Sequence, residues 1–165
     1  MKAYYWGILA LLVLLAGCVD VCQTSECFLD AVLDCRPITY KHPFHYVDET
    51  LEATGFIVFS LDKTPEGCRM EVSYENLQIR YRWELRQQLL QNYTLEEIKQ
   101  KEEELLRKVA RPFICEFKNY SALYGLLVTS VFKEEPDLSI YLHAERLFME
   151  EDLGHCYKFK NLTSE

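Results

Sequence analysis

The seven cysteine thiols are the residues of this chain whose spacing says most about chemistry. No two of them have the Cys-x-x-Cys spacing that is typical of structural zinc sites and thioredoxin-like redox centres. An odd number leaves one thiol over if the others form disulfides. The sequence therefore predicts six paired cysteines and one with a separate fate. The seven are Cys18, Cys22, Cys27, Cys35, Cys68, Cys115 and Cys156.

The amino terminus indicates what happens to the first of these thiols. A lysine at position 2 precedes an uncharged, mostly apolar run over residues 3–19, a pattern typical of a secretory signal peptide. Residues 15–18 read Leu-Ala-Gly-Cys, which resembles the lipobox of prokaryotic lipoproteins. The resemblance implies removal of residues 1–17, a lipid on the Cys18 thiol and one extracytoplasmic domain over residues 18–165. Two alternatives remain: plain secretion after a cut beside Cys18, or a retained helix at the lower limit of membrane-spanning length.

With Cys18 consumed, the other six cysteines can pair completely, and an exported chain is expected to contain disulfides. Apolar residues at helical spacing over 24–35 limit which pairs can form. Cys27 and Cys35 are eight positions apart in this helix. Their Cα atoms are then about 12 Å apart, whereas a disulfide needs roughly 4.4–6.8 Å. Each of these two must therefore pair with a different cysteine.

Three of the four asparagines lie in Asn-x-Ser/Thr tripeptides: Asn92, Asn119 and Asn161. This tripeptide is the N-glycosylation acceptor pattern of exported proteins, although any single match can be accidental. A lipobox together with acceptor tripeptides indicates a cell that both lipidates and glycosylates its surface proteins. The sequence therefore favours an archaeal surface glycoprotein.

Composition limits the class of partner. The formal net charge is −8 and 49% of the residues are hydrophobic, so the chain has enough apolar residues for one folded domain. An acidic chain does not suit the phosphate backbone of nucleic acid. We expect no nucleic-acid partner, and we expect contact with a membrane only through the lipid on Cys18.

The apolar spacing predicts an α+β fold. Helices are expected over 24–35, 83–91 and 94–111, the last starting with a Thr94–Glu97 capping box and carrying an apolar face from Leu95 to Val109. Strands are expected over 56–61, 68–74, 77–83, 123–132, 138–142 and 157–159, with a turn at 134–137 and an optional helix over 143–151. The alternation changes phase at Glu75 and Asn76, which requires a bulge or a tight turn. We expect an antiparallel sheet with the disulfide-linked N-terminal helix and the central pair of helices packed on one face.

The pattern Cys-x4-Cys-Phe-x2-Ala-x3-Cys-x-Pro over residues 22–37 resembles the start of small exported lipoprotein-like proteins of archaea and bacteria. In that group a signal peptide or lipobox precedes this helix and an antiparallel sheet follows it. The resemblance covers about residues 11–75 and implies a location and a fold, but no assigned activity.

The sequence contains no catalytic motif, and we predict no catalytic, cofactor-binding or metal-binding residue. His42, His45, Asp48 and Glu49 form the one cluster with metal-ligand chemistry, but loop or strand-edge histidines explain it better because Pro43 excludes a helix. Aromatic residues either fill the sheet core and rim or form a surface for a protein or carbohydrate. These are Tyr74, Tyr81, Trp83, Tyr120, Tyr124, Tyr141 and Tyr157.

The leading functional prediction is a membrane-anchored, disulfide-stabilised surface lipoprotein that binds a partner on the outer face of the cell membrane. Two alternatives remain. One is a secreted hydrolase whose carboxylates the sequence does not reveal, and the other is a structural component of the cell envelope.

Overall fold

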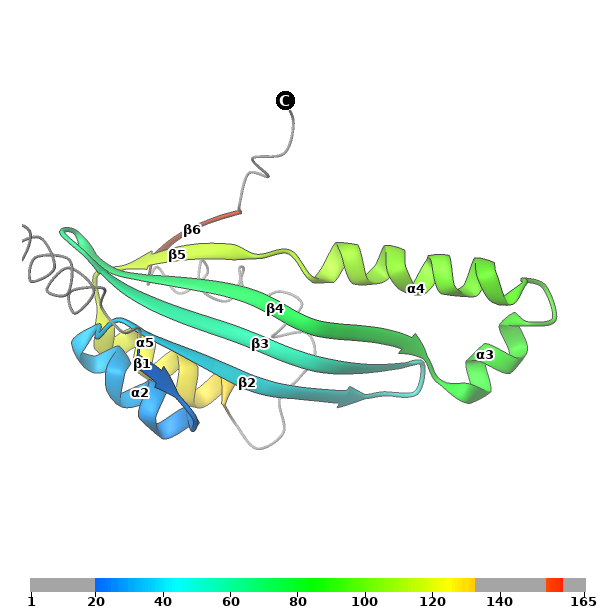
Figure 1. Cartoon of the computed structure of the whole chain (residues 1–165), viewed down its shortest axis with the longest axis horizontal. Helices are drawn as coiled ribbons and strands as arrows, with labels where there is room; N and C mark the ends of the chain where they lie inside the picture. Colours follow the sequence, from blue (N-terminus) through cyan, green and yellow to red (C-terminus); the bar gives the residue numbers. More distant parts are fainter. Residues whose placement is uncertain (1–19, 133–153, 159–165) are drawn as a thin grey trace, which may run out of the picture.

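One elongated sheet of six strands runs through the molecule (Figure 1). The computed structural model describes residues 20–132 and 154–158. Strands follow one another across the sheet in chain order, the first pair parallel and all later pairs antiparallel. The strands are β1 (Asp20–Cys22), β2 (Ile38–Val47), β3 (Leu51–Thr64), β4 (Gly67–Tyr81), β5 (Phe113–Phe117) and β6 (Gly154–Lys158). The helices are α2 (Ser25–Asp34), α3 (Trp83–Leu89), α4 (Leu95–Val109), α5 (Tyr120–Leu126) and the π-helix η1 (Leu127–Val131).

The predicted α+β class is confirmed, with its antiparallel strands, its disulfide-linked N-terminal helix and its central pair of helices. Three features of the sheet were not predicted. The short β1 pairs parallel to β2, the ten residues of β2 form a full strand, and residues 113–117 form β5. Pro43 lies in β2 beyond the three residues that β1 covers, where a missing backbone N–H is tolerated.

One face of the sheet is apolar along the strands because a bulge in β4 shifts the alternation of its side chains between the two faces. The register between β3 and β4 shifts between Thr54 and Phe56, and Asn76 has a positive φ of 52°. Opposite it, Gly55 has a φ of 155°, and a Cβ there would lie 2.6 Å from the Leu77 Cα. The phase change at Glu75 and Asn76 is therefore a bulge, and it keeps apolar side chains before and after it on the same face.

Helix α2 packs on this apolar face. Thr24 begins the helix, because its hydroxyl accepts a hydrogen bond from the Cys27 backbone N–H. Phe28 is fully buried and its ring lies 5.6 Å from those of both Tyr40 and Phe59 in the sheet. The helix ends at Cys35, which adopts the left-handed conformation. The helix predicted over 24–35 is confirmed.

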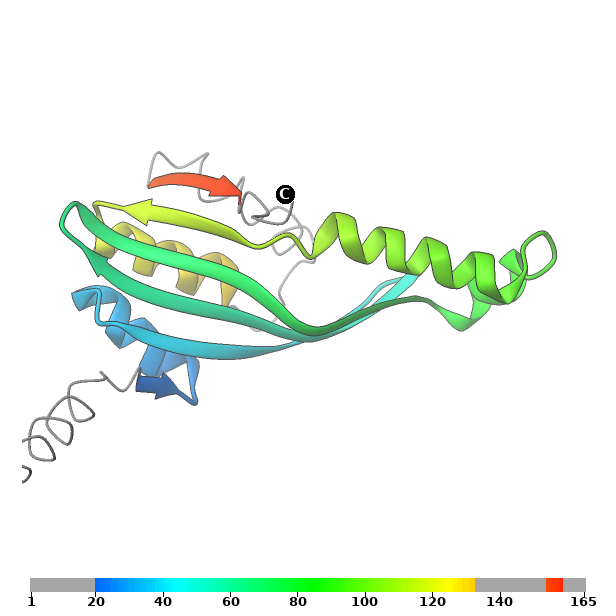
Figure 2. The ribbon, with the colours of Figure 1, turned by 45° about the horizontal axis from the view of Figure 1, so that its top comes forward.

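The strand predicted over 123–132 is wrong. This segment continues from α5 into η1, beside α2 (Figure 2). Its buried residues are Leu123, Leu126, Leu127 and Val131, which recur at three- and four-residue spacing and so mark one helix face. The run of apolar and β-branched residues hid that period. The expected strand over 138–142, the turn over 134–137 and the helix over 143–151 lie outside the described residues.

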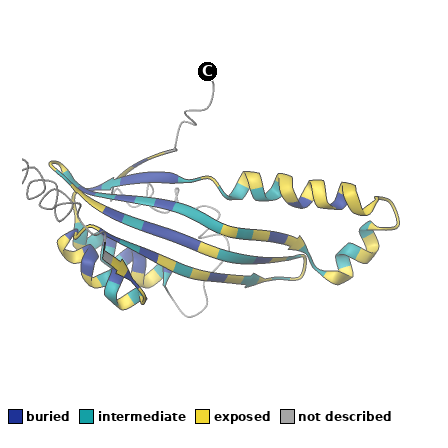
Figure 3. Cartoon of the chain, in the orientation of Figure 1, coloured by how far each residue is buried: buried dark blue, intermediate teal, exposed yellow. Residues whose placement is uncertain are grey.

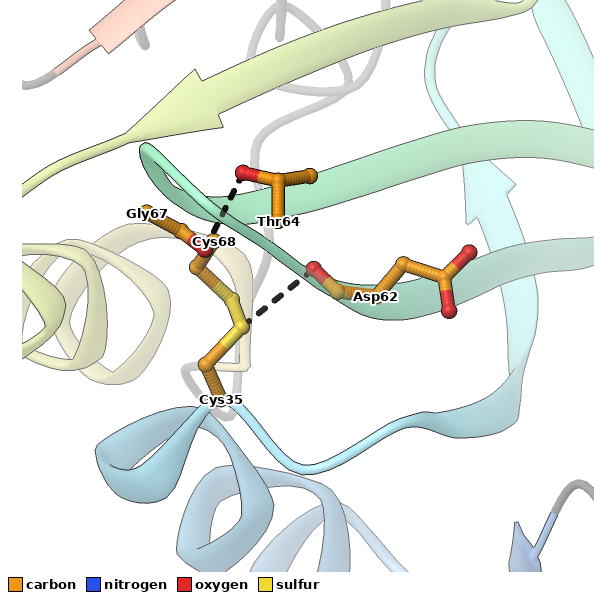
Figure 4. Close-up of a disulfide and its surroundings, with 5 residues drawn as sticks. All are labelled: Cys35, Asp62, Thr64, Gly67 and Cys68. Atoms are coloured by element: carbon orange, nitrogen blue, oxygen red, sulfur yellow. Dashed lines mark hydrogen bonds between the residues drawn. A yellow bond between two sulfur atoms is a disulfide. The ribbon is translucent and has the colours of Figure 1, made fainter.

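Three disulfides join elements at one end of the molecule. Cys22–Cys27 links β1 to α2, and Cys115–Cys156 links β5 to β6. Cys35–Cys68 ties the end of α2 to the start of β4, with Cys35 Sγ 3.3 Å from the Asp62 backbone oxygen (Figure 4). Cys27 and Cys35 thus have different partners, as the helix geometry required. Three disulfides are typical of an oxidising, extracytoplasmic compartment.

Helices α3 and α4 form an arm at the opposite end, defined here as residues 83–109. Helix α3 lies beyond the ends of β2, β3 and β4, and α4 runs back beside the second half of β4 (Figure 1). Both predicted helices are confirmed, as is the Thr94–Glu97 capping box. Most positions of α3 and α4 are exposed, unlike the centre of the sheet (Figure 3).

Candidate interaction surface

The histidine and carboxylate cluster at residues 42–49 does not come together. His42 and His45 are three positions apart in a strand and therefore point to opposite faces of the sheet. His42 lies on the apolar face, where its ring is 5.2 Å from that of Phe132 and burial lowers the pKa of the imidazole. Asp48 instead accepts hydrogen bonds from the Thr50 and Leu51 backbone N–H groups in the β2–β3 turn. Over residues 20–132 and 154–158, no group of three potential ligands is placed to hold a metal ion.

A hollow of about 440 Å³ lies at the β3–β4 turn, between the end of β5 and the start of β6. Its two carboxyl groups are Glu66, which is exposed, and Glu116, which accepts a hydrogen bond from the Tyr157 hydroxyl at 3.2 Å. Within the described part of the chain the one buried carboxyl group is Glu102, which lies on α4. The hollow therefore lacks the buried carboxyl group typical of an acid catalyst. It is lined by Thr64, Glu66, Gly67, Glu116, Phe117, Lys118, Asn119, Gly154 and His155.

The second face of the sheet carries mainly polar side chains. Lys41 Nζ and Glu75 Oε2 lie 2.6 Å apart and join β2 to β4 across β3. Val58, between them on β3, is 6% exposed although it points to this face. Both charged side chains are about half exposed, so the pair contributes little to stability. This face has the character of an ordinary solvated surface.

Five of the ten exposed large apolar side chains of the described residues lie at the end of the molecule that carries the arm. We call Val47, Trp83, Leu90, Tyr93 and Leu95 the distal patch; each of them is at least 40% exposed. They belong to the end of β2, to α3, to the loop after α3 and to the first residue of α4. Apolar side chains grouped on a surface mark sites of association more often than single exposed ones do.

Helix α3 packs little against the rest of the described structure. None of its residues is buried, and its first residue, Trp83, is 69% exposed. Isolated helices shorter than about 12 residues are marginal in water, and helices in proteins are stabilised mainly by packing one face. This seven-residue helix therefore receives little stabilisation from the core.

The arm is held to the sheet by α4. Glu102, only 8% exposed, accepts a hydrogen bond from the Tyr81 backbone N–H at 2.9 Å. Ile98 is fully buried beside it, one turn earlier on the helix. Strand β5 pairs with β4 only over Cys68–Val72, so α4 lies along the part of the β4 edge that has no strand neighbour. The helix protects that edge and positions the distal patch.

The outer end of α4 departs from the predicted apolar face. Leu95 was expected to pack with Ile98 and Val109, but it is 49% exposed because α4 extends beyond the last residues of β4. The capping box satisfies the helix start, and the Thr94 backbone N–H lowers the pKa of the Glu97 carboxyl. Lys101 Nζ lies 4.7 Å from the centre of the Tyr93 ring. These contacts order the tip without covering it.

The aromatic residues predicted from the sequence do not form one surface. Burial raises the pKa of Tyr74 to about 12, and Tyr120 and Tyr124 pack against the core. Trp83 and Tyr157 are exposed, but they belong to α3 and β6, far apart in the fold. Tyr141 lies outside the described residues. Sequence reasoning missed Val47, Leu90 and Tyr93, because no motif in the sequence sets them apart from other apolar residues.

The acceptor tripeptides differ in their placement. Asn92 is exposed in the loop between α3 and α4, and Asn119 is exposed at the N-cap of α5. Cys18 and Asn161 lie outside the described residues. Between residues 20 and 132 and over 154–158, no helix is long and apolar enough to cross a bilayer. No protein family, curated protein or solved structure matches this chain.

Proposed function

We propose that this protein is a membrane-tethered extracellular binding module that presents its arm to a partner protein. The proposal depends on one geometric observation. The first described strand, β1, lies with α2 at one end of the molecule, and the distal patch lies at the other (Figure 1). A lipid on Cys18, two residues before β1, would therefore direct the arm away from the membrane.

The tether follows from the lipobox-like residues 15–18 and from the resemblance of residues 22–37 to exported lipoprotein-like proteins. The three disulfides are consistent with export, and Cys18 is the cysteine they leave over. One acyl chain binds a membrane only marginally, so stable anchoring requires two chains. On this proposal the protein is an archaeal surface lipoprotein.

The chemistry of the distal patch favours a protein over a carbohydrate. Three of its five side chains are aliphatic: Val47, Leu90 and Leu95. Carbohydrates are bound through aromatic rings and hydrogen bonds, whereas aliphatic side chains with an aromatic anchor are typical of protein interfaces. Trp83 is the residue most suited to the role of anchor, because tryptophan is enriched among the residues that dominate binding free energy.

The tether is tested by intact-mass measurement of protein extracted from host membranes. The expected mass is that of a chain starting at Cys18 plus lipid, and a Cys18→Ala variant should leave the membrane fraction. A chain that starts near Cys18 without added lipid would mean plain secretion. A chain that keeps residues 1–17 would mean a retained helix.

The arm is tested by photo-crosslinking on intact host cells. A photoreactive residue replaces Trp83 in one variant and Val128 in a matched control, because Val128 is also exposed but belongs to η1 at the other end. We expect an adduct with one protein from position 83 that position 128 does not give. Equal adducts from both positions, or none from position 83, would contradict arm binding. An adduct with a second copy would favour the cell-envelope alternative.

A further inference from the structure

We infer that Asn92 is the asparagine that is N-glycosylated in the folded protein and that Asn119, which matches the same acceptor pattern, is not. The inference requires export, but it does not require a partner for the arm. If arm binding is correct, a glycan on Asn92 also limits the partner's access to the distal patch, because Asn92 is next to Tyr93 of that patch. The two tripeptides differ in how much of the structure must open before each can enter the cleft of a transferase.

The Asn92 tripeptide is a surface loop held by local bonds. Asn92, Tyr93 and Thr94 are all exposed, and they separate α3 from α4. The backbone N–H groups of Asn92 and Tyr93 both donate to the Leu89 carbonyl oxygen, at 3.0 and 2.9 Å. No residue between 89 and 97 is buried, so opening this loop exposes no core.

The hydroxyl of this tripeptide is also within reach of an enzyme. Thr94 Oγ1 donates to Glu97 Oε2 at 2.9 Å and accepts from the Glu97 backbone N–H at 3.3 Å. Both groups are exposed to solvent, so water or a transferase can replace these bonds. The Thr94–Glu97 capping box therefore slows opening of the loop between α3 and α4 but does not prevent it.

The Asn119 tripeptide is part of a helix. Asn119 Oδ1 accepts a hydrogen bond from the Ala122 backbone N–H at 3.0 Å, and Tyr120 and Ser121 form the first turn of α5. Phe117, two residues earlier, and Leu123, four residues later, are buried in the core. Asn119 itself is already extended, but an extended conformation through Tyr120 and Ser121 would unwind the first turn of α5 and pull on the buried Leu123. Local opening of this kind is far rarer than opening of a surface loop.

The modification is a glycosyl transfer from a lipid-linked oligosaccharide. The Asn92 Nδ2 lone pair forms a bond to the anomeric carbon, while the bond from that carbon to the lipid phosphate oxygen breaks. The Nδ2 atom loses one proton to a base of the transferase, and the polyprenyl phosphate or pyrophosphate leaves with the bonding electrons. No oxidant or reductant takes part.

A glycan on Asn92 would flank Leu90, Tyr93 and Leu95, which are its neighbours in the distal patch. Trp83 begins α3, and the length of that helix separates it from Asn92. The glycan would therefore cover the tip and leave Trp83 and Val47 for a protein partner. Trp83 and Val47 would then be the residues of the distal patch that remain available on the native surface.

The test is glycosylation of the purified, disulfide-intact chain by an oligosaccharyltransferase with its lipid-linked donor, followed by glycopeptide mass spectrometry. Asn92→Gln and Asn119→Gln variants confirm the site assignments. The same reaction on reduced, alkylated chain shows whether the enzyme accepts both tripeptides when no fold constrains them. These readouts do not involve membranes or partners, so failure here is distinguishable from failure of the proposed function.

We expect the oxidised chain to be modified at Asn92 at least roughly tenfold faster than at Asn119, because local opening limits the second site. In the reduced chain the preference for Asn92 should fall to the one set by the tripeptides themselves, Asn-Tyr-Thr against Asn-Tyr-Ser. Equal rates in the oxidised chain, faster modification of Asn119, or an oxidised chain left unmodified at Asn92 would each overturn the inference.

Discussion

At the end of the molecule that holds α2 and α5, the two helices lie across the sheet and disulfides join neighbouring elements. At the arm end, α3 has no buried residue, and α4 is held to β4 through Glu102 and Ile98. The first end therefore carries most of the buried core and all three disulfides. Large apolar side chains stay exposed at both ends: Val21, Leu33, Val128 and Tyr157 at the first, and the five residues of the distal patch at the second. We call these two ends the stapled end and the arm end.

In this small disulfide-bonded domain the cross-links and most of the core packing lie at the stapled end. Apolar burial and cross-links there fix the fold, so the arm end can keep apolar side chains exposed without loss of the native state. The same kind of change should therefore have unequal effects at the two ends.

The largest contrast is expected from removal of one aromatic side chain at each end. Phe28→Ala empties a fully buried site between α2 and the sheet and should cost about 3–5 kcal/mol. Trp83→Ala removes a mostly exposed ring and should change stability by less than about 0.5 kcal/mol. Denaturant unfolding followed by circular dichroism measures both. Similar losses for the two variants would mean that the arm end is packed as tightly as the stapled end.

The disulfides should differ in how much each stabilises the fold, according to the length of the loop that it closes. Cys35 and Cys68 are 33 positions apart, and Cys22 and Cys27 only 5. Chain-entropy arguments give a loss of about 3.7 kcal/mol for Cys35→Ala/Cys68→Ala and about 2 kcal/mol for Cys22→Ala/Cys27→Ala. Thermal melts of the two double variants measure this order. Melting temperatures unchanged by reductant in the wild-type protein would contradict a structural role for all three bonds.

Loss of the Glu102 carboxyl group should loosen the arm while leaving the stapled end intact. Glu102→Ala leaves the Tyr81 backbone N–H without its acceptor, which should cost about 1–3 kcal/mol. Glu102→Gln keeps an acceptor oxygen and should cost less. Hydrogen exchange should accelerate at Tyr81 and along α4 in the alanine variant, with α2 unaffected. Equal acceleration in α2 would mean that the two ends unfold together.

The smallest effect concerns pH at the β2–β3 turn. Partial burial raises the pKa of Asp48, but hydrogen bonds from Leu51, Thr50 and Tyr46 outweigh it and lower the pKa from 3.8 to about 2. A lowered pKa stabilises the fold above the unfolded value, and this contribution is lost as the pH falls from about 4 to about 2. Because the side chain is largely solvated, the loss should be no more than about 1 kcal/mol.

Unfolding of wild type and Asp48→Asn across this pH range measures the effect, since the asparagine keeps an acceptor oxygen but does not titrate. The stability difference between the two should shrink as the pH falls. A difference that stays constant from pH 5 to pH 2 would show that Asp48 has no lowered pKa.

Much of the local structure could be predicted because its causes lie within a few residues. Thr24 caps α2, and Thr94 with Glu97 caps α4, through bonds that span three positions. The bulge in β4 was visible as a change of alternation at Glu75 and Asn76. The helix of α5 and η1 was missed because its apolar residues fit a strand by composition and a helix by spacing, and only packing against α2 and the sheet separates the two.

The candidate site could not be predicted in the same way. Leu95 and Ile98 belong to one apolar face of α4 by sequence, yet one is exposed and the other buried, because Leu95 begins α4 at the end that extends beyond β4 (Figure 1). Trp83 was named as one aromatic residue among seven, and only the position of α3 beyond the sheet distinguishes it. Asn92 and Asn119 both match the acceptor pattern, with Thr94 and Ser121 as third residues, and the structural difference between them is the helix that starts at Asn119.

The sequence by itself determined the α+β class, the helix starts and the requirement that Cys27 and Cys35 have different partners, because hydrogen bonds and side-chain periods along a few residues set these features. The tertiary structure alone decided which cysteines meet, which apolar residues stay exposed and which end of the molecule they occupy. Those outcomes depend on contacts between segments far apart in the chain, where burial of one face against another outweighs local preference.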